Sequence, residues 1–493
     1  MKKLAIVLLL FFTFCNIKAQ VNGVIVSDTG KFTIVKIWGT HAERGYAYGY
    51  LMGNKIKSLY VNYMRPQIGV SNINTIKQMI ADGANISIDA NYILEAKGIV
   101  SGMVLAGIDT TGINYLDILV ANSFLDITAF SGKKGKDIGL GCSGLMSWGD
   151  ATLGTDLDGK SVISRHLDWT TNSNLLNSMV MVIHLPSEID EQPWLLIGFA
   201  GQMSVLSGNN KNIAVYQHVL GNVTGSNPSL GQQYEPIWFS MRKALEKKDY
   251  NGDGANNVND MRSVFNDHPQ GYAGDYIVTA LAPYSSGVDS LIALVSEITP
   301  VNPKFSFRTN SYPDSIPGDN LYAANYPISR NNAMDFCSRY NGIRSNISNG
   351  TNIGSAENWN LLRDFSHQST NIQLIQFIPE MDILKVSVYK NSHPAYQNAP
   401  MIYSLNNLFS SVAGISENNE NHPRLYPNPC VNYISIVPAF VSPTLYIIYD
   451  YMGKICEQGY CTQTINTSKL LPGIFKIVIK NEKYFSSSAF VKL

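Results

Sequence analysis

The sequence predicts a mixed α+β protein followed by a small all-β module. Segments such as NSMVMVIHLP and EQPWLLIGFAG are short, rich in β-branched and aromatic residues and bounded by turn residues, as β-strands are. Residues 70–130 instead contain longer apolar segments, among them ILEAKGIVSGMVLAGI, that indicate amphipathic or buried helices. After residue 424 the pattern changes to short alternating strands separated by turns, which is typical of a β-sandwich.

The composition narrows the class of protein. The chain of 493 residues is long enough for two or three domains. It is 45% hydrophobic, 11% aromatic and 15% charged, with a formal net charge of +0. This suits an extracellular β-rich protein, and the lack of a basic excess argues against a nucleic-acid-binding one.

Residues 1–20 have the pattern of a signal peptide: two lysines, an apolar run and a small residue, Ala19, near the cleavage point. A lipoprotein acylated on Cys15 is the weaker alternative. No other apolar stretch is long enough to predict a transmembrane helix. One of the six cysteines lies in this leader, and the odd remainder predicts at least one free thiol, while Cys456 and Cys461 could close a small loop.

The segment 141–169, GCSGLMSWGDATLGTDLDGKSVISRHLDW, predicts a β-hairpin whose joint is rich in Gly, Asp and Thr. Pairing centred near Thr155 would place Cys142 roughly opposite Asp168, with Arg165 close to both. The nearest histidine, His166, is expected to point away from Arg165 and Asp168. The hairpin therefore predicts a thiol facing a carboxylate and a guanidinium.

A thiol attacks a carbonyl as the thiolate, so it needs a base or a lowered pKa. Cleavage between Gly141 and Cys142 would supply a base, because the freed α-amine has a pKa of about 8. Asp168 would orient that amine, and Arg165 would hold the thiolate or a substrate oxygen. The preceding stretch KKGKDIGLG predicts an exposed linker where such a cut could be made. The alternative is a buried cysteine in a hairpin that also carries a surface ion pair.

The elements CSG and VISRHLDW resemble the C-(S/T)…GRN-x-D-W signature of the N-terminal-nucleophile cysteine amidases. That superfamily includes choloylglycine hydrolases, acid ceramidase, N-acylethanolamine acid amidase and the acyltransferases of peptidase family C45. The resemblance implies that Cys142 is the nucleophile, with Arg165 and Asp168 as its partners. It also implies an αββα four-layer sandwich, in which residues 21–141 form a propeptide or small subunit and residues 142–410 the catalytic domain.

Three further stretches resemble family elements in the family's order. In GFAGQMSVLSGNNKNIAVYQH, Asn209 or Asn210 falls at a first family asparagine. A later family asparagine, an oxyanion donor, aligns with His218 or Gln217, and either side chain can still donate a hydrogen bond. Asn325 in NLYAANYPISR matches another oxyanion donor.

The third of these stretches is CSRYNGIR, in which Arg339 matches a second family arginine and Arg344 is the fallback. Taken together, the resemblance spans about residues 35–410. Near its start, Gly45, Gly49 and Gly53 recur four apart, which predicts a helix face packed closely against a neighbour.

The stretch DYNGDGANNVND has the spacing of a calcium-binding EF-hand or dockerin-like loop, with Gly254 at its sixth position. Its predicted oxygen ligands are Asp249, Asn251, Asp253, Asn257 and Asp260. The alternative is a solvated loop rich in Asn, Asp and Gly. We expect structural calcium at most, and no cofactor for catalysis.

Residues 411–424 are polar and rich in turn residues, and predict a linker. The following residues 425–493 resemble the type A C-terminal sorting domain of type IX secretion substrates. The elements YPNP, D-x-x-G-K, L-x-x-G-x-(Y/F) and the terminal FVKL occur in that order. The resemblance implies export by the type IX secretion machinery to the cell surface or the medium.

The function that this sequence predicts is hydrolysis of a linear amide of a small N-acyl compound, or acyl transfer if an amine outcompetes water. Two alternatives remain open. One is a lipid or ester hydrolase of the phospholipase B-like type, and the other is a non-catalytic binding protein displayed on the surface. The identity of the substrate is not set by any motif.

Overall fold

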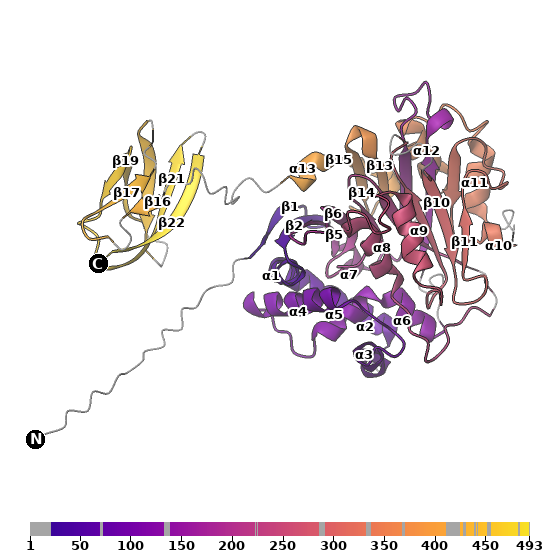
Figure 1. The fold of residues 1–493 in the computed structure, drawn as a ribbon, viewed down its shortest axis with the longest axis horizontal. Helices are drawn as coiled ribbons and strands as arrows, with labels where there is room; N and C mark the ends of the chain where they lie inside the picture. The colour runs from indigo at the N-terminus through magenta and orange to yellow at the C-terminus, as the bar shows by residue number, and fades with distance from the viewer. Residues whose placement is uncertain are drawn as a thin grey trace, which may run out of the picture. The chain divides into compact units, whose positions relative to one another are not determined.

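The computed structural model describes residues 21–69, 72–132, 139–221, 223, 225–284, 291–331, 337–366, 370–410, 424–426, 430–437, 440, 442–450, 455–481 and 484–492. The predicted signal peptide and nearly all of the predicted linker lie outside these residues. The chain divides into two compact units, Met1–Phe409 and Ser410–Leu493 (Figure 1).

Two β-sheets form the centre of the first unit. The nine-stranded sheet has the order β1-β2-β5-β6-β7-β8-β9-β10-β11, and the six-stranded sheet has the order β12-β3-β4-β13-β14-β15. The strands are β1 (Gly23–Asp28), β2 (Thr33–Gly39), β3 (Gly141–Ser147), β4 (Val162–Asp168), β5 (Met179–Pro186), β6 (Trp194–Phe199), β7 (Ser207–Asn209), β8 (Ala214–Val219), β9 (Tyr276–Leu281), β10 (Ala293–Ile298), β11 (Phe305–Arg308), β12 (Asn320–Ala323), β13 (Asn371–Ile378), β14 (Ile383–Val388) and β15 (Met401–Ser404).

Helices cover the outer faces of both sheets (Figure 1). They are α1 (His41–Leu59), which continues through a π-helical turn (Tyr60–Met64) into α2 (Arg65–Ile68), then α3 (Ile73–Ala81), α4 (Ala90–Leu105), α5 (Tyr115–Asn122), α6 (Phe124–Phe130), α7 (Ser173–Leu176), α8 (Ile237–Glu246), α9 (Val258–Asn266), α10 (Ile328–Asn331), α11 (Ser338–Asn346), α12 (Ser355–Phe365) and α13 (Leu405–Phe409). Helix α8 packs on β8 and α9 on β9, while α12 packs on β3 and β4.

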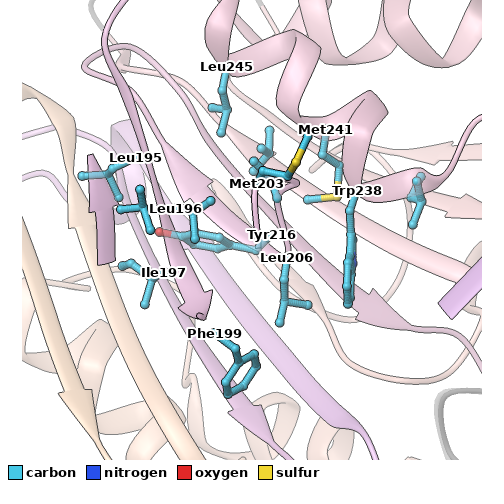
Figure 2. Close-up of a cluster of buried hydrophobic side chains, with 14 of the residues drawn as sticks. Leu195, Leu196, Ile197, Phe199, Met203, Leu206, Tyr216, Trp238, Met241 and Leu245 are labelled. Atoms are coloured by element: carbon cyan, nitrogen blue, oxygen red, sulfur yellow. The ribbon is translucent and has the colours of Figure 1, made fainter. Parts of the chain in front are cut away.

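Strand β8 shows how the layers are stacked. Its Gln217 side chain accepts a hydrogen bond from Trp238 Nε1 of α8 at 3.2 Å. The next residue, His218, lies on the opposite face of the strand, against Gly144 of the second sheet. The order helix, sheet, sheet, helix confirms the predicted αββα sandwich. Figure 2 shows part of the core between β6, β8 and α8, where Trp238, Met241 and Leu245 line the inner face of the helix.

The glycines of α1 pack against α4, as their spacing predicts. A Cβ atom at Gly45 would lie 2.1 Å from the carbonyl oxygen of Glu95, and one at Gly49 would lie 1.9 Å from that of Ile99. In return, a Cβ atom at Gly102 of α4 would lie 2.0 Å from the Tyr46 carbonyl oxygen. No larger side chain fits between backbones at this separation, so the two helices touch directly.

The segment before Cys142 contributes two strands, β1 and β2, to the nine-stranded sheet of the first unit. Strand β1 forms one edge of the nine-stranded sheet, and β2 pairs in parallel with β5 over seven residue pairs, from Thr33 with Val180 to Gly39 with Pro186. Helix α1 then packs on β1, β2 and β5. The segment before Cys142 therefore supplies strands and hydrogen bonds that the segment after it needs.

The second unit is all β, as predicted. It contains a three-stranded sheet and a four-stranded sheet around one small core. The strands are β16 (Arg424–Tyr426), β17 (Tyr433–Val437), β18 (Thr444–Tyr449), β19 (Ile455–Cys461), β20 (Thr464–Asn466), β21 (Gly473–Asn481) and β22 (Tyr484–Lys492). Cys456 and Cys461 lie on the same extended strand, roughly 16 Å apart, so the small disulfide loop considered for them is wrong. Of the helices in the described part of the chain, none is long and apolar enough to cross a bilayer.

Candidate active site

The hairpin of β3 and β4 positions Cys142, but its register differs by one residue from the predicted one. Cys142 pairs with Leu167, and Gly141 pairs with Asp168. The connection 148–161 contains an even number of residues, so the centre of the hairpin falls between Gly154 and Thr155 rather than on Thr155. A shift of one residue moves a side chain to the other face of a sheet. Asp168 therefore does not face the thiol.

The thiol shares its face with Arg165. The Arg165 Nη2 atom lies 3.5 Å from Cys142 Sγ and donates to the Gln217 carbonyl oxygen at 3.0 Å. Gly144 is the direct partner of Arg165 in the ladder, and its missing side chain leaves room for the guanidinium to reach across. A Cβ atom at Gly144 would also meet the His218 ring, at 3.3 Å from Cε1. This glycine thus lets two polar side chains approach the thiol.

Asn325 and Arg339 hold the backbone of Cys142 instead of its side chain. The Cys142 N–H donates to Asn325 Oδ1 at 3.0 Å, and Asn325 Nδ2 donates to the Val219 carbonyl oxygen at 2.8 Å. Arg339 donates to Asn325 Oδ1 and to Asp168 Oδ2, and its Nη1 lies 3.4 Å from the Cys142 carbonyl oxygen. The five residues predicted as catalytic thus come together around one peptide unit. Asn325 Nδ2 would have to leave Val219 before it could donate to an oxyanion.

The protonation of the thiol follows from this environment. Burial raises the pKa of Cys142, and the nearby Asp168 carboxylate adds to that rise. The guanidinium groups of Arg165 and Arg339 and the Val219 N–H act in the opposite direction but do not prevail. In the uncut chain the thiol is therefore held protonated at neutral pH, and an additional base would be needed to activate it.

Of the predicted residues Asn209, Asn210 and His218, His218 is the one that lies against Gly144, on the strand that carries Cys142. Its Nε2 lies 3.1 Å from Thr279 Oγ1, while its Nδ1 has no hydrogen-bond partner among the described residues. Burial, followed by the charges of Arg165 and Arg339, lowers its pKa well below the usual range. His218 is therefore a neutral imidazole, and it lies against Gly144, two residues from Cys142 on β3.

Asn209 and Asn210 lie away from Cys142, so their contact with a substrate stays a prediction. They lie where β7 turns into β8, with Asn209 paired to Ala214. Val219 is five residues further along an extended strand, roughly 16 Å away. Asn210 Oδ1 accepts the N–H groups of Asn212 and Ile213, at 2.7 and 2.8 Å.

The predicted calcium loop uses two of its five candidate ligands for another purpose. Asn257 is the N-cap of α9, and Asp260 closes a capping box with it. The Asp260 carboxylate also accepts the Tyr250 N–H and is fully buried. Asp249 accepts three backbone N–H groups of the loop, and Asn251 Nδ2 donates to Asp253 Oδ2 at 2.9 Å. This fits a loop that closes on its own hydrogen bonds, so calcium stays a prediction.

If calcium binds this loop, we expect 1 mM CaCl2 to raise the melting temperature of the whole protein, because only the folded loop gathers the ligands. Asp253→Ala should abolish the rise. MgCl2 at the same concentration is the control, since magnesium demands a smaller octahedral site. An equal melting temperature with and without CaCl2 would leave the capped loop as the correct description.

Two polar clusters around the site were not predicted. One joins Ser143 to His166, which lies on the face of Asp168 and not away from it. The expectation for His166 was wrong because residues two apart on a strand share a face, a signal present in the sequence. The other surrounds His41 of α1, whose ring contacts Glu95 at 2.8 Å and Glu191 at 2.9 Å.

The His41 cluster is an ion-pair network rather than a metal site. His41, Glu191 and Glu246 carry ligand atoms within reach of one ion. Both ring nitrogens of His41 are already bound to carboxylates, and Glu246 is bound by Arg242 at 2.7 Å. Burial alone would lower the pKa of His41, but hydrogen bonds to Glu191 and Glu95 raise it to about 9. A protonated histidine does not ligate a metal.

A small apolar cavity lies beside Trp169, the residue that follows β4. It offers 20 Å³, which is room for about one water molecule. Its lining combines residues from before and after Cys142, namely Ile56, Leu59, Tyr60, Met64, Ile118, Ala121, Trp169, Phe199, Ala200, Gly201, Gln202 and Trp238. A substrate would have to displace side chains to occupy it.

Comparisons with known proteins support the C-terminal assignment most directly. Residues 424–492 match the family described as the secretion system C-terminal sorting domain. The match confirms the predicted type IX sorting domain and the predicted secretion to the cell surface or the medium.

The other known proteins to which this chain is similar share little sequence identity with it. The chain is 22% identical over 236 residues to protein dcd1B of Dictyostelium discoideum, a match covering 44% of this chain and 43% of that protein. The chain thus spans less than half the length of this curated relative. It is also similar to the solved N-acylethanolamine-hydrolyzing acid amidase ortholog of Caenorhabditis elegans, with 12% identity and a TM-score of 0.36. That similarity covers 53% of this chain and 100% of the other.

Proposed function

We propose that this protein is a secreted amide hydrolase whose nucleophile, Cys142, becomes an N-terminal residue when the chain is cut after Gly141. The observation that carries the proposal is the set of contacts around the Cys142 peptide unit. Arg165 reaches the sulfur at 3.5 Å, and Asn325 accepts the Cys142 N–H at 3.0 Å. Asp168 is connected to the same nitrogen through Arg339 and Asn325. Cys142 thus has an amide oxygen on its nitrogen and a guanidinium on its sulfur, with the Asp168 carboxylate one residue further away. Such an arrangement has a use if that nitrogen becomes an amine.

The cut itself can be written as an acyl shift within the chain. Cys142 Sγ attacks the Gly141 carbonyl carbon, the C–N bond breaks, and the thiol proton ends on the Cys142 nitrogen. Water then hydrolyses the thioester, which leaves a carboxylate on Gly141 and a free amine and thiol on Cys142. The freed amine supplies the base that the buried thiol lacks in the uncut chain.

In the cut enzyme the amine would take the thiol proton, and the thiolate would attack the carbonyl carbon of the substrate. The same proton would then go to the leaving amine, which completes an acyl-enzyme that water resolves. Arg165 would hold the thiolate, while the neutral His218, with Asn325 if its Nδ2 turns, would donate to the oxyanion. One such donor typically contributes about 3–4 kcal/mol to the transition state. An amine acceptor in place of water would make the same site an acyltransferase.

The substrate bond is tested with matched pairs of N-acyl amides and O-acyl esters that share one acyl group. We expect the wild-type enzyme to release amine from at least one amide, and His218→Phe to slow that release by about 10²-fold through loss of a donor. Release of acid from esters alone would favour the lipid or ester hydrolase. Turnover of neither class, by a chain that is correctly cut, would favour the non-catalytic binding protein.

A further inference from the structure

The uncut chain places its own residues on the acyl side of the bond that the proposed function would break. Gly141 is buried at the start of β3 and pairs with Asp168 in the ladder. Leu140, which precedes it, is 4% exposed and belongs to the hydrophobic core of the first unit. The last two residues before the bond therefore fill buried space next to the nucleophile.

The guanidinium of Arg339 lies against the Cα atom of Gly141. A Cβ atom at Gly141 would lie 2.6 Å from Arg339 Nη2 and 2.8 Å from Nη1. Both distances are well below an ordinary van der Waals separation of about 3.5–4.0 Å. Arg339 is held where it is, because it donates to Asp168 Oδ2 and to Asn325 Oδ1. The fixed guanidinium leaves no room for a side chain at Gly141.

The acyl shift would turn Gly141 into the acyl group of a thioester. Cys142 Sγ bonds to the Gly141 carbonyl carbon, the C–N bond breaks, and the thiol proton goes to the Cys142 nitrogen. A substrate amide gives the same kind of thioester on the same sulfur when the thiolate displaces its amine. Water then releases a carboxylate and restores the thiol in both cases. The segment that ends at Gly141 therefore stands in for the acyl group of a substrate.

A straight alkanoyl chain can be matched to this segment atom by atom. Its first carbon corresponds to the Gly141 carbonyl carbon and its second to Gly141 Cα, beside Arg339. The path continues through the Gly141 nitrogen and the Leu140 backbone to the end of the Leu140 side chain, about eight atoms in all. An octanoyl chain that replaces the segment after the cut thus presents a CH2 group to Arg339 and reaches the buried apolar position of Leu140.

We propose that Arg339 determines which acyl groups the site accepts, by excluding a substituent of L configuration on the carbon next to the carbonyl. This rests on the proposed function, in which Cys142 carries the acyl group. Straight-chain acyl groups and glycyl groups are accepted, because they carry only hydrogen at that position. Acyl groups of L-amino acids with a side chain are excluded, and most peptide bonds with them. The substrate class is an amide of an apolar acyl chain that is unbranched beside its carbonyl.

Mirror-image substrates test this proposal. The two enantiomers of the 2-methyloctanoyl amide of aminomethylcoumarin have the same size, apolar surface and reactivity, but only one has its methyl group in the configuration of an L-alanine side chain. We measure kcat/KM for both enantiomers and for the octanoyl amide with correctly cut wild-type protein. We expect the enantiomer of L configuration to be about 10- to 100-fold slower than its mirror image, the penalty for overpacking a fixed site.

Equal values of kcat/KM for the two enantiomers, or a slower mirror image, would overturn the proposal and leave the amide hydrolase standing. Hydrolysis of other N-acyl amides but of none of these three would do the same. If a correctly cut chain hydrolyses no amide at all, the proposed function fails, and this inference fails with it.

A second measurement uses the chain's own bond and needs no added substrate. Cutting is followed by intact mass at intervals after cell-free synthesis. Gly141→Ala should be cut at least about tenfold more slowly than wild type, because its methyl group meets Arg339. The melting temperature of uncut Gly141→Ala, compared with that of uncut Cys142→Ala, shows whether the variant is folded. A folded Gly141→Ala that is cut as fast as wild type would overturn the proposal, whereas a wild type that is never cut would overturn the proposed function as well.

Discussion

Replacing Cys142 with alanine should leave the purified protein as one uncut chain, whereas wild type should yield two fragments with a new N-terminus at Cys142. The substitution removes the thiol that would attack the Gly141 carbonyl, and without it the acyl shift has no nucleophile. Intact mass and N-terminal sequencing measure both fragments directly. The fold should survive, because alanine fills most of the cysteine site and leaves the backbone contacts of Asn325 and Arg339 unchanged.

A matched control keeps this result specific. Cys337 is a half-buried free cysteine at the start of α11, close in sequence to Arg339. Cys337→Ala should be cut to the same extent as wild type. A new N-terminus at Cys142 in the alanine variant would show that another protease makes the cut. A wild-type protein that stays whole would remove the α-amine, and with it the base on which the proposed mechanism depends.

The second large effect is expected on stability. It comes from buried charged side chains that join the segment before Cys142 to the segment after it. Arg242 of α8 donates to Glu95 of α4 at 2.7 Å and to Glu246 at 2.7 Å, and its guanidinium lies 4.5 Å from the Tyr92 ring centre. Arg44 of α1 likewise donates to Glu191 at 3.1 Å. All five of these charged side chains are at most 2% exposed. The fragments before and after the cut therefore share one buried ionic network.

We expect the two fragments to stay together after cleavage and to elute as one species in gel filtration without denaturant. Arg242→Met should lower the free energy of unfolding by about 3–5 kcal/mol, because Glu246 would be left buried without its cation and Glu95 would keep only His41. The control is Lys57→Met, which removes a partly exposed ion pair with Asp109 at 3.0 Å, outside this network. That change should have little effect on stability, because exposed ion pairs contribute little. Similar melting temperatures for the two variants would contradict this account.

The same network makes the stability depend on pH in a predictable direction. The folded pKa of His41, about 9, is raised above its usual value of about 6.5. Its contribution is therefore fully present below about pH 6.5 and is lost as the pH rises through about 9. The melting temperature of wild type should fall over this range, and that of His41→Gln should fall less.

Much of this protein could be predicted without its structure, because the signals are local. Alternation and turn residues predicted the strands, glycines four apart predicted the contact of α1 with α4, and ordered short motifs predicted the sorting domain. The residues Cys142, Arg165, Asp168, Asn325 and Arg339 were also identified from motifs. Such patterns indicate which face of a helix or strand is buried and which chemistry a residue can perform. Both can be read from residues that are close together in the chain.

Only the tertiary structure decided what these residues face. The hairpin register moved Asp168 to the side of Arg339 and away from the thiol, because a difference of one residue in the connection reverses the face of every side chain after it. Asn209 pairs with Ala214, at the end of β8 away from Val219, and that separation from Cys142 cannot be read from residue types. The ionic network of His41, Arg242 and Glu95 joins segments about 150 to 200 residues apart, and such contacts leave no local pattern. Residue identity and local pattern were set by the sequence, whereas register and long-range contacts were set by how the two sheets and their helices pack.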